Sequence, residues 1–311
     1  MKKILVIGSF TMDLVALTPR APMEGETIIG TSFQQFTGGK GANQAVAAAR
    51  LGADVTMFGK LGRDSFGEAH IETLKREGVN YEYILFAENE SSGVGHITLE
   101  ANGNNRIIVI PGTNHKVTPE DVENIEVQIK NSDIIMLQLE IPFDTVYKSI
   151  ELAHKHNKTI ILNPAPAVKL KEEYVKLVDY IVPNETEAAI LTGIEVNTIE
   201  TARKAGRKLL DLGCKNVIIT LGSKGVLLIN DNEEIFKESF KVKPVDTTAA
   251  GDSFIGAFAY SLSHGVEHAK ALEYACAVGA ITVTKMGAQP SLPNFSEVEK
   301  FIKERQIVKV N

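Results

Sequence analysis

Short apolar stretches alternate with longer amphipathic stretches along most of the chain, and this alternation limits the possible folds more than any other feature. The run from Lys3 to Gly8 is almost continuously apolar, which is typical of a strand buried on both faces. Further strands are predicted at 54–58, 133–139, 159–162, 179–182 and 216–221, and helices at 65–77, 119–130, 142–156, 198–212, 267–284 and 296–305. This order predicts a three-layer, doubly wound α/β fold: a mostly parallel sheet with helices on both faces.

Two segments depart from the alternation. In 13–36, the stretches 14–17, 27–29 and 33–36 are predicted antiparallel strands around proline and glycine turns. In 93–110, Asn102, Gly103 and Asn104 form a strong hairpin signal between two apolar stretches. We predict one domain over 1–311, from which about 13–36 and 93–110 project as a small antiparallel β lid. An edge extension of the main sheet, or a dimer contact, is the alternative.

The stretch from Val245 to Leu262 carries the strongest chemical signal. Apolar residues at 240–245 suggest a strand, 247–252 is a turn of small residues, and 254–262 has helical spacing. The first amides of a helix lack partners within it and favour anions, above all phosphate. Asp252 lies at the same point and could take a proton from an attacking hydroxyl. The turn therefore indicates phosphoryl transfer, and a helix capped by an acidic residue is the alternative.

A second glycine-rich turn, 37–50, runs into an alanine-rich helix. It lacks the Ser or Thr that a P-loop requires after its lysine, because Gly41 follows Lys40. The segment after Gly8 likewise fails the dinucleotide-binding pattern. Lys40 and Asn43 offer donors suited to sugar hydroxyls, although a generic helix start is possible.

Polar residues stand at the predicted strand ends, where parallel sheets bind ligands. Together with the two glycine-rich turns they favour a polar small-molecule site. They are Asp13, Glu140, Asn163, Asn184, Gly222 and the turn at 247–252.

Composition excludes other classes of function. The net charge of -6 argues against nucleic acid or an anionic membrane as the main partner. Cys214 and Cys276 have no metal or redox spacing, so we expect two reduced thiols and a cytoplasmic protein. The first apolar run stops at Gly8, too early for a signal peptide, and no stretch reaches the length of a membrane span.

Five motifs resemble those of the ribokinase-like (PfkB) carbohydrate kinases, and the resemblance covers essentially the whole chain. GGKGANQA at 38–45 and DTTAAGDSF at 246–254 are similar to the two signatures of that family. NETE at 184–187 resembles its N-x-x-E motif, TLGSKG at 220–225 its nucleotide loop, and GAQPS at 287–291 a C-terminal segment.

The resemblance implies ATP-dependent phosphorylation of D-ribose at O5 to give ribose 5-phosphate, in a homodimer joined through the lids. Asp252 would be the catalytic base, and the backbone of Ala249, Ala250, Gly251 and Asp252 the anion hole. The sugar would contact Thr11, Met12, Asp13, Gly39, Lys40, Gly41, Asn43, Glu140 and Asp252.

The same resemblance implies ATP, Mg²⁺ and K⁺ as cofactors. Glu187 would organise Mg²⁺ through water, and a K⁺ loop would comprise Asp246, Thr248, Thr282, Lys285, Gly287 and Ser291. ATP would contact Asn184, Thr220, Leu221, Gly222, Ser223, Lys224, Gly225, Gly251 and Cys276.

One position departs from the family pattern. Ribose-specific members commonly carry Asn two residues before the sugar-binding Asp, where this chain has Thr11, and relatives acting on 2-deoxyribose have Met there. A 2-deoxyribose kinase is therefore the alternative within the family. A catalytically silent sugar-binding regulator is a further alternative, against which Asp252 and the intact glycine turn speak.

Overall fold

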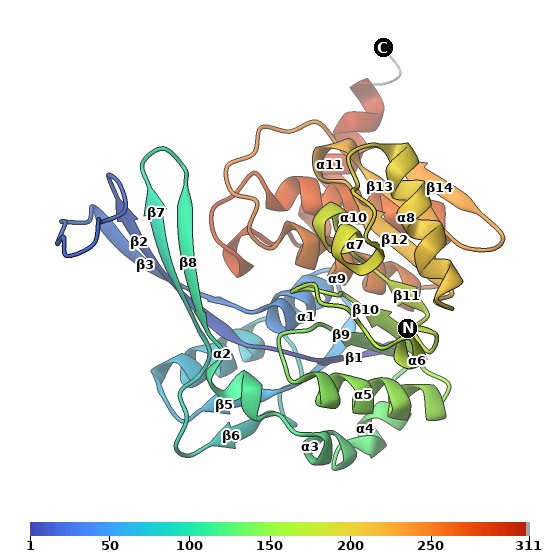
Figure 1. The fold of residues 1–311 in the computed structure, drawn as a ribbon. Coiled ribbons are helices and arrows are strands. Elements are labelled where there is room, and N and C mark those ends of the chain that lie inside the picture. The colour runs from blue at the N-terminus through green and yellow to red at the C-terminus, as the bar shows by residue number, and fades with distance from the viewer. Residues whose placement is uncertain (309–311) are drawn as a thin grey trace.

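The computed structural model describes residues 1–308, and an eight-stranded sheet runs through its centre (Figure 1). The strand order is β14-β13-β12-β11-β10-β9-β1-β4. Strands from β12 to β4 pair in parallel, whereas β13 and β14 form an antiparallel edge. The strands are β1 (Lys3–Ile7), β4 (Asp54–Phe58), β9 (Ile134–Leu137), β10 (Thr159–Leu162), β11 (Tyr180–Ile181), β12 (Asn216–Thr220), β13 (Val226–Ile229) and β14 (Glu234–Lys237).

Helices cover both faces of this sheet, as predicted. Side chains alternate along each strand, so that Ile4 and Val6 pack with one helical layer and Leu5 and Ile7 with the other. The first layer holds α1 (Lys40–Arg50), α2 (Ser65–Arg76), α9 (Ala250–Ser263), α10 (His268–Thr282) and α11 (Phe295–Val308). The second holds α3 (Pro119–Glu123), α4 (Glu126–Asn131), α5 (Phe143–Lys155), α6 (Glu172–Val175), α7 (Glu185–Thr192) and α8 (Ile199–Asp211).

A four-stranded sheet of order β3-β2-β7-β8 projects from the main body (Figure 1). The predicted antiparallel pairs β2–β3 and β7–β8 are both present, and a parallel pairing of β2 with β7 joins them. Every residue of β8 is exposed. The strands are β2 (Thr11–Thr18), β3 (Ser32–Gly38), β7 (Val94–Glu100) and β8 (Asn105–Ile110), and a separate short pair is β5 (Lys60–Gly62) with β6 (Leu85–Ala87).

Three sequence predictions of local structure are wrong. The stretch 27–29 is not a strand, because β3 and β7 already occupy both edges of β2 and Ile29 is left 91% exposed in the connecting loop. Residues 240–245 are not a strand, because the hairpin of β13 and β14, which sequence patterns missed, occupies that edge of the sheet. The helix predicted at 119–130 is interrupted at Asn124 and Ile125, although Thr118 caps its start as expected.

Candidate active site

A cavity of about 190 Å³ lies at the carboxyl ends of β10, β11 and β12, where the starts of α1, α7 and α9 meet. This is the edge at which a parallel sheet binds ligands. The cavity is lined by Lys40, Asn163, Ala165, Val182, Asn184, Glu187, Thr220, Thr247, Ala249, Ala250, Gly251, Asp252 and Ile255. The sequence therefore located most of this site, while Ala165, Val182 and Ile255 are apolar wall residues without any distinguishing pattern.

The start of α9 is open toward the cavity. Ala249 adopts a left-handed conformation with φ 60° and ψ 9°, and no side chain caps the helix. The Ala250 amide donates to the Thr247 carbonyl, whereas the amides of Gly251 and Asp252 have no acceptor in the described part of the chain. A Cβ placed on Gly251 would meet nothing within 4 Å. Two free amides facing open space at a helix N-terminus suit an anionic group.

Asp252 is 7% exposed and is held by two side-chain amides of α1. Asn43 donates through Nδ2 to Oδ2 at 2.9 Å, and Gln44 donates through Nε2 to Oδ1 at 3.1 Å. Our sequence reasoning missed Gln44. The sequence did offer a signal for Gln44, which is a large amide residue in a helix otherwise rich in alanine. In the structure Gln44 is fully buried.

Lys40 lies among four carboxylates. Asp252 foremost, then Glu140, Glu187 and Asp13, raise its pKa above the ordinary lysine value despite its burial. Glu140 is anchored by the Lys40 backbone amide, which donates to its Oε2 at 3.0 Å. A cationic group at this point balances the negative charge of the site and is well placed to attract a phosphate.

Asp13 on β2 is the second buried carboxylate of the site. Gly38 and Gly95 flank it on the neighbouring strands, and a Cβ on either would come within 2.7 Å of its oxygens. Burial, then the charges of Glu140, Asp252 and Asp246, raise the pKa of Asp13 to about 7, while Lys40 opposes the shift. Within residues 1–308 the Asp13 carboxylate accepts no side-chain or backbone hydrogen bond, so its oxygens are free for a ligand hydroxyl.

The other residues predicted to bind the sugar lie around this aspartate. Thr11 is 9% exposed and shares the strand face of Asp13, whereas Met12 between them points to the opposite face. Gly39 precedes α1, with φ 89°, and Gly41 lies in its first turn, directly against the backbone of Ser9.

Asn184 and Glu187 form a capping box at the start of α7. Glu187 accepts from the Asn184 backbone amide at 2.8 Å, and Asn184 Oδ1 accepts from the Glu187 amide at 2.8 Å. Burial raises the pKa of Glu187, while the Asn184 amide and Lys40 lower it. The N-x-x-E motif therefore shapes the cavity wall as a helix cap, and both carboxylate oxygens of Glu187 accept from Asn184.

The predicted ATP residues divide into two groups. Asn184, Thr220 and Gly251 line the cavity, whereas 221–225 and Cys276 do not. Lys224 instead donates to Glu185 and to the Asn197 carbonyl. Cys276 is packed in the core, where burial raises the pKa of its thiol to about 12.

The predicted K⁺ residues come from two segments that meet. Asp246 accepts from the Thr248 amide at 2.9 Å and from the Gly287 amide at 2.8 Å. Thr282 is fully buried and Ser291 donates to the Ala288 carbonyl. Lys285 turns away to pair with Glu297 at 2.7 Å, so its ammonium group does not enter the loop.

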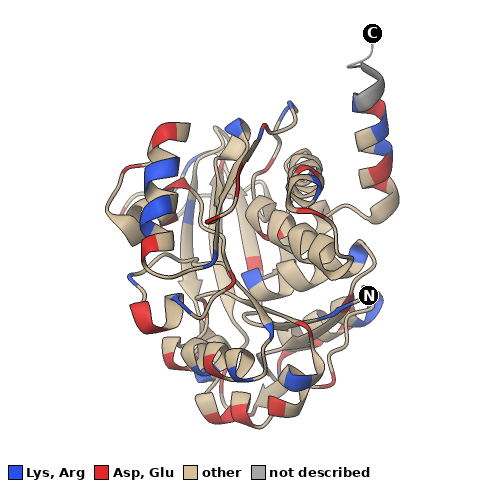
Figure 2. Ribbon diagram, turned by 90° about the vertical axis from the view of Figure 1, so that its right-hand side faces the viewer, with Lys and Arg blue, Asp and Glu red and all other residues tan. Residues whose placement is uncertain are grey.

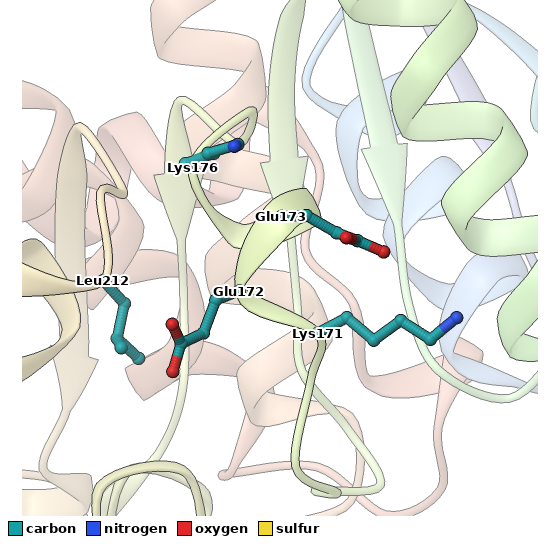
Figure 3. Close-up of a pocket in the computed structure, with 5 residues that line it drawn as sticks. All are labelled: Lys171, Glu172, Glu173, Lys176 and Leu212. Carbon is teal, nitrogen blue, oxygen red and sulfur yellow. The ribbon is translucent and has the colours of Figure 1, made fainter.

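Elsewhere in the described residues we find no second candidate site comparable with this cavity. No group of three His, Cys, Asp or Glu side chains there is arranged to hold a metal ion, and none of the helices in that range is long and apolar enough to cross a membrane. Basic and acidic side chains are interspersed over the helices (Figure 2). A hollow of about 590 Å³ lies beside α6, but its charged side chains spread in different directions (Figure 3). It is lined by Lys171, Glu172, Glu173, Lys176 and Leu212.

Comparison with known proteins gives a consistent result. The family model described as pfkB family carbohydrate kinase matches residues 1–294. A ribokinase of Bacillus subtilis is 44% identical over 302 residues, covering 97% of this chain and 100% of that protein. A deoxyribokinase of Salmonella typhi is 41% identical over 300 residues, covering 96% and 98%. The solved structure of Arabidopsis thaliana ribokinase complexed with ribose and ATP superposes with a TM-score of 0.90 at 34% identity, covering 97% and 99%.

Proposed function

Because this chain belongs to the pfkB family of carbohydrate kinases, we propose that it transfers the terminal phosphoryl group of ATP to the O5 hydroxyl of D-ribose. The observation that carries this proposal is the buried Asp252 carboxylate beside the free amides at the start of α9. Asp252 accepts the proton of the attacking hydroxyl. The amides of Gly251 and Asp252 stabilise negative charge on the phosphoryl group in transfer.

The sugar site lies between Asp13 on the projecting sheet and Asp252 on the main body. Asp13 accepts no hydrogen bond from the described residues, so its oxygens receive sugar hydroxyls, and Lys40 and Asn43 supply donors from α1. Glu140, held by the Lys40 amide, contributes a further acceptor. With its other hydroxyls held by these acceptors and donors, the sugar presents its O5 hydroxyl to Asp252.

We assign ATP to the cavity wall formed by Asn184, Thr220 and Gly251. Its phosphates fit the start of α9, and the 221–225 loop directly follows Thr220, which lines the cavity. Mg²⁺ would accompany the phosphates and would be held through water by Glu187, because the described residues offer no cage of carboxylates for a bare ion. When bound, the ion would neutralise the negative charge that develops on the phosphates during transfer.

A monovalent cation site is assigned to the Asp246 and Gly287 segments. The two segments are already joined, because the Gly287 amide donates to Asp246 Oδ2 at 2.8 Å, and the Asp246 segment runs directly into the turn before α9. K⁺ there would hold the backbone of the anion site in place. The expected outcome is several-fold faster turnover in potassium than in sodium buffer at matched ionic strength. Equal rates would remove this assignment.

The projecting sheet is proposed to act as a lid and as the contact between two copies of the chain. Its edge strand β8 exposes Ile107, Ile108 and Val109 at 53%, 63% and 62%, an apolar surface that a monomer rarely leaves open. Closure over the sugar excludes water, which would otherwise accept the phosphoryl group. Hydrogen exchange should slow in both 13–36 and 93–110 when ribose is added. Unchanged exchange in both would reduce the sheet to a static contact.

A 2-deoxyribose kinase is the second candidate, favoured by Thr11 and by the similarity to a deoxyribokinase. A panel of sugars in a coupled assay of ADP release decides between them. We expect ribose to give the highest kcat/KM. A strong preference for 2-deoxyribose would replace the first candidate, and no turnover with any sugar would favour a silent sugar-binding protein.

The buried, unpaired Cys214 and Cys276 suit a reducing compartment such as the cytoplasm.

A further inference from the structure

Two buried amides, Gln138 and Gln44, lead from the end of strand β9 to the carboxylate of Asp252, and a third, Asn163, accepts from Gln44. Gln138 follows β9 and is fully buried; its Nε2 donates to Gln44 Oε1 at 2.7 Å. Gln44 Nε2 in turn donates to Asp252 Oδ1 at 3.1 Å and to Asn163 Oδ1 at 3.2 Å. Both hydrogens of the Gln44 amide and its oxygen therefore have partners inside the protein.

This arrangement determines which way the Gln44 amide faces. In the opposite orientation its oxygen would meet the oxygens of Asp252 and Asn163, and its NH₂ would meet the NH₂ of Gln138. The contact with Asp252 decides the orientation, because a carboxylate can only accept and the NH₂ of Gln44 must therefore face it. Gln44 Oε1 is then left to accept from Gln138, whose own Oε1 has no partner in the described residues. Gln44 has no exposed surface and so has little freedom to rotate when ligands arrive.

Asn43 holds the other oxygen of Asp252 in a different way. Its Nδ2 donates to Oδ2 at 2.9 Å, but its own Oδ1 is buried and has no partner in the described residues. The side chain is 5% exposed and lies beside Lys40, which lines the cavity. An unpaired acceptor suits a ligand hydroxyl, so a ligand can compete for the amide of Asn43, whereas the oxygen and the NH₂ of Gln44 already have partners inside the protein.

We propose that Gln44 is a positioning residue for the proton acceptor: it holds Oδ1 of Asp252, with its own oxygen satisfied by Gln138, and thereby leaves Oδ2 to meet the sugar hydroxyl. The inference rests on the proposed function, because Gln44 can position the proton acceptor only if Asp252 is the base. The charged groups of other elements that act on Asp252 are Lys40, Asp13 and Glu187, and Glu140 acts in turn on Asp13 and Lys40.

Two substitutions of Gln44 test this role. Gln44→Met keeps the length but removes the donor; we expect kcat to fall about 10- to 100-fold while the sugar KM changes less than about 3-fold. Gln44→Glu keeps the shape and the acceptor for Gln138 but places a second carboxyl group at Oδ1. Since two carboxyl groups this close do not both ionise readily, the acidic limb of the kcat–pH profile should move upward by about one pH unit or more.

Two controls separate positioning from stability. Gln138→Leu leaves Gln44 in place without its orienting donor, and we expect a smaller loss of kcat in the same direction. Ser149→Ala removes a fully buried hydrogen bond of α5, far along the chain from the site, and should lower Tm without changing kcat or its pH profile. If Gln44→Met does not fold, Gln44→Glu and Gln138→Leu still decide the question.

The outcomes for the inference and for the proposed function are distinct. Wild-type kcat and pH profile in Gln44→Met and Gln44→Glu, with Asp252→Asn inactive, would overturn the role of Gln44 alone. Full turnover in Asp252→Asn would overturn the base assignment itself, whatever the Gln44 variants do. A loss seen in sugar KM without a change in kcat would also overturn the positioning role, because it would place Gln44 in ground-state binding.

Discussion

The two buried aspartates of the site differ in how far the protein itself satisfies them. Asp252, on the main body, accepts hydrogen bonds from Asn43 and Gln44. Asp13, on the projecting sheet, accepts none within the described residues and faces the charges of Glu140 and Asp252. The first carboxylate is therefore held ready before any ligand binds, whereas the second depends on a ligand to satisfy it.

The same difference appears in the two sheets. Strand β9 at the centre of the main sheet is buried throughout, and strand β8 at the edge of the projecting sheet is exposed throughout. Helices on both faces complete the main sheet within the chain, but the projecting sheet has an uncovered apolar surface. In the proposed function the main body supplies the chemistry, and the projecting sheet gains its remaining contacts from substrate or from a second copy.

Substitution of Asp252 should give the largest effect. In Asp252→Asn the carboxylate is lost but the shape is kept, so we expect kcat to fall by about two to four decades with the fold and sugar binding retained. Steady-state kinetics, titration calorimetry with ribose and circular dichroism measure the three properties. Asp54→Asn, an exposed aspartate at the start of β4, is the matched control. Turnover near that of wild type would mean that the preorganised carboxylate is not the base.

A charge on the uncovered sheet should break the proposed dimer. Val109→Asp would bury an unpaired carboxylate between two copies, so we expect association to weaken at least about 100-fold. Light scattering coupled to size exclusion measures the mass. Val127→Asp on α4 is the matched control, because Val127 and Val109 are both 62% exposed. A dimer that survives Val109→Asp contradicts the assignment of β8 to the interface.

Thr11 should tune which sugar the projecting sheet accepts. Its hydroxyl can meet the 2-hydroxyl of ribose or turn to a backbone carbonyl, so 2-deoxyribose should remain a substrate within about 1 to 3 kcal/mol in transition-state binding. Thr11→Asn should sharpen the preference for ribose, and Thr11→Met should weaken or reverse it. The measurement is kcat/KM for both sugars in all three proteins. A ratio that is equal in the Asn and Met variants would show that Thr11 does not face the 2-position.

Replacing Asp13 should stabilise the ligand-free protein, in contrast to Asp252. Burial and like charges raise the pKa of Asp13 to about 7, so between about pH 4 and pH 7 the folded state keeps a proton that the unfolded chain releases. The free energy of unfolding therefore falls as the pH rises through this window, and the penalty is complete above it.

Asp13→Asn removes that penalty, so we expect a gain of roughly 1 to 2 kcal/mol at about pH 8 that shrinks toward about pH 5. Urea unfolding at both pH values measures it, and sugar affinity should fall in the same variant because the carboxylate acceptor is lost. A variant that is no more stable at the higher pH would mean that Asp13 is satisfied within the protein.

The amino-acid sequence by itself determined the layered fold and most of the cavity wall. Continuous apolar strands, helical spacing and cap residues such as Thr118 are local signals, and each lies within a few residues of what it specifies. The turn at 247–252 was recognisable for the same reason, since small residues before an apolar helix are visible without knowing what packs beside them.

Tertiary structure alone decided the pairings and the contacts between distant residues. The stretch 27–29 has strand-like residues but no free sheet edge, and the parallel pairing of β2 with β7 joins segments that are about 80 residues apart. The bond from Gln44 to Asp252 spans 208 positions, and the pKa of Asp13 depends on three carboxylates from two other segments of the chain. Such interactions arise from proximity in space, and a local pattern in the sequence carries no record of which distant group will lie nearby.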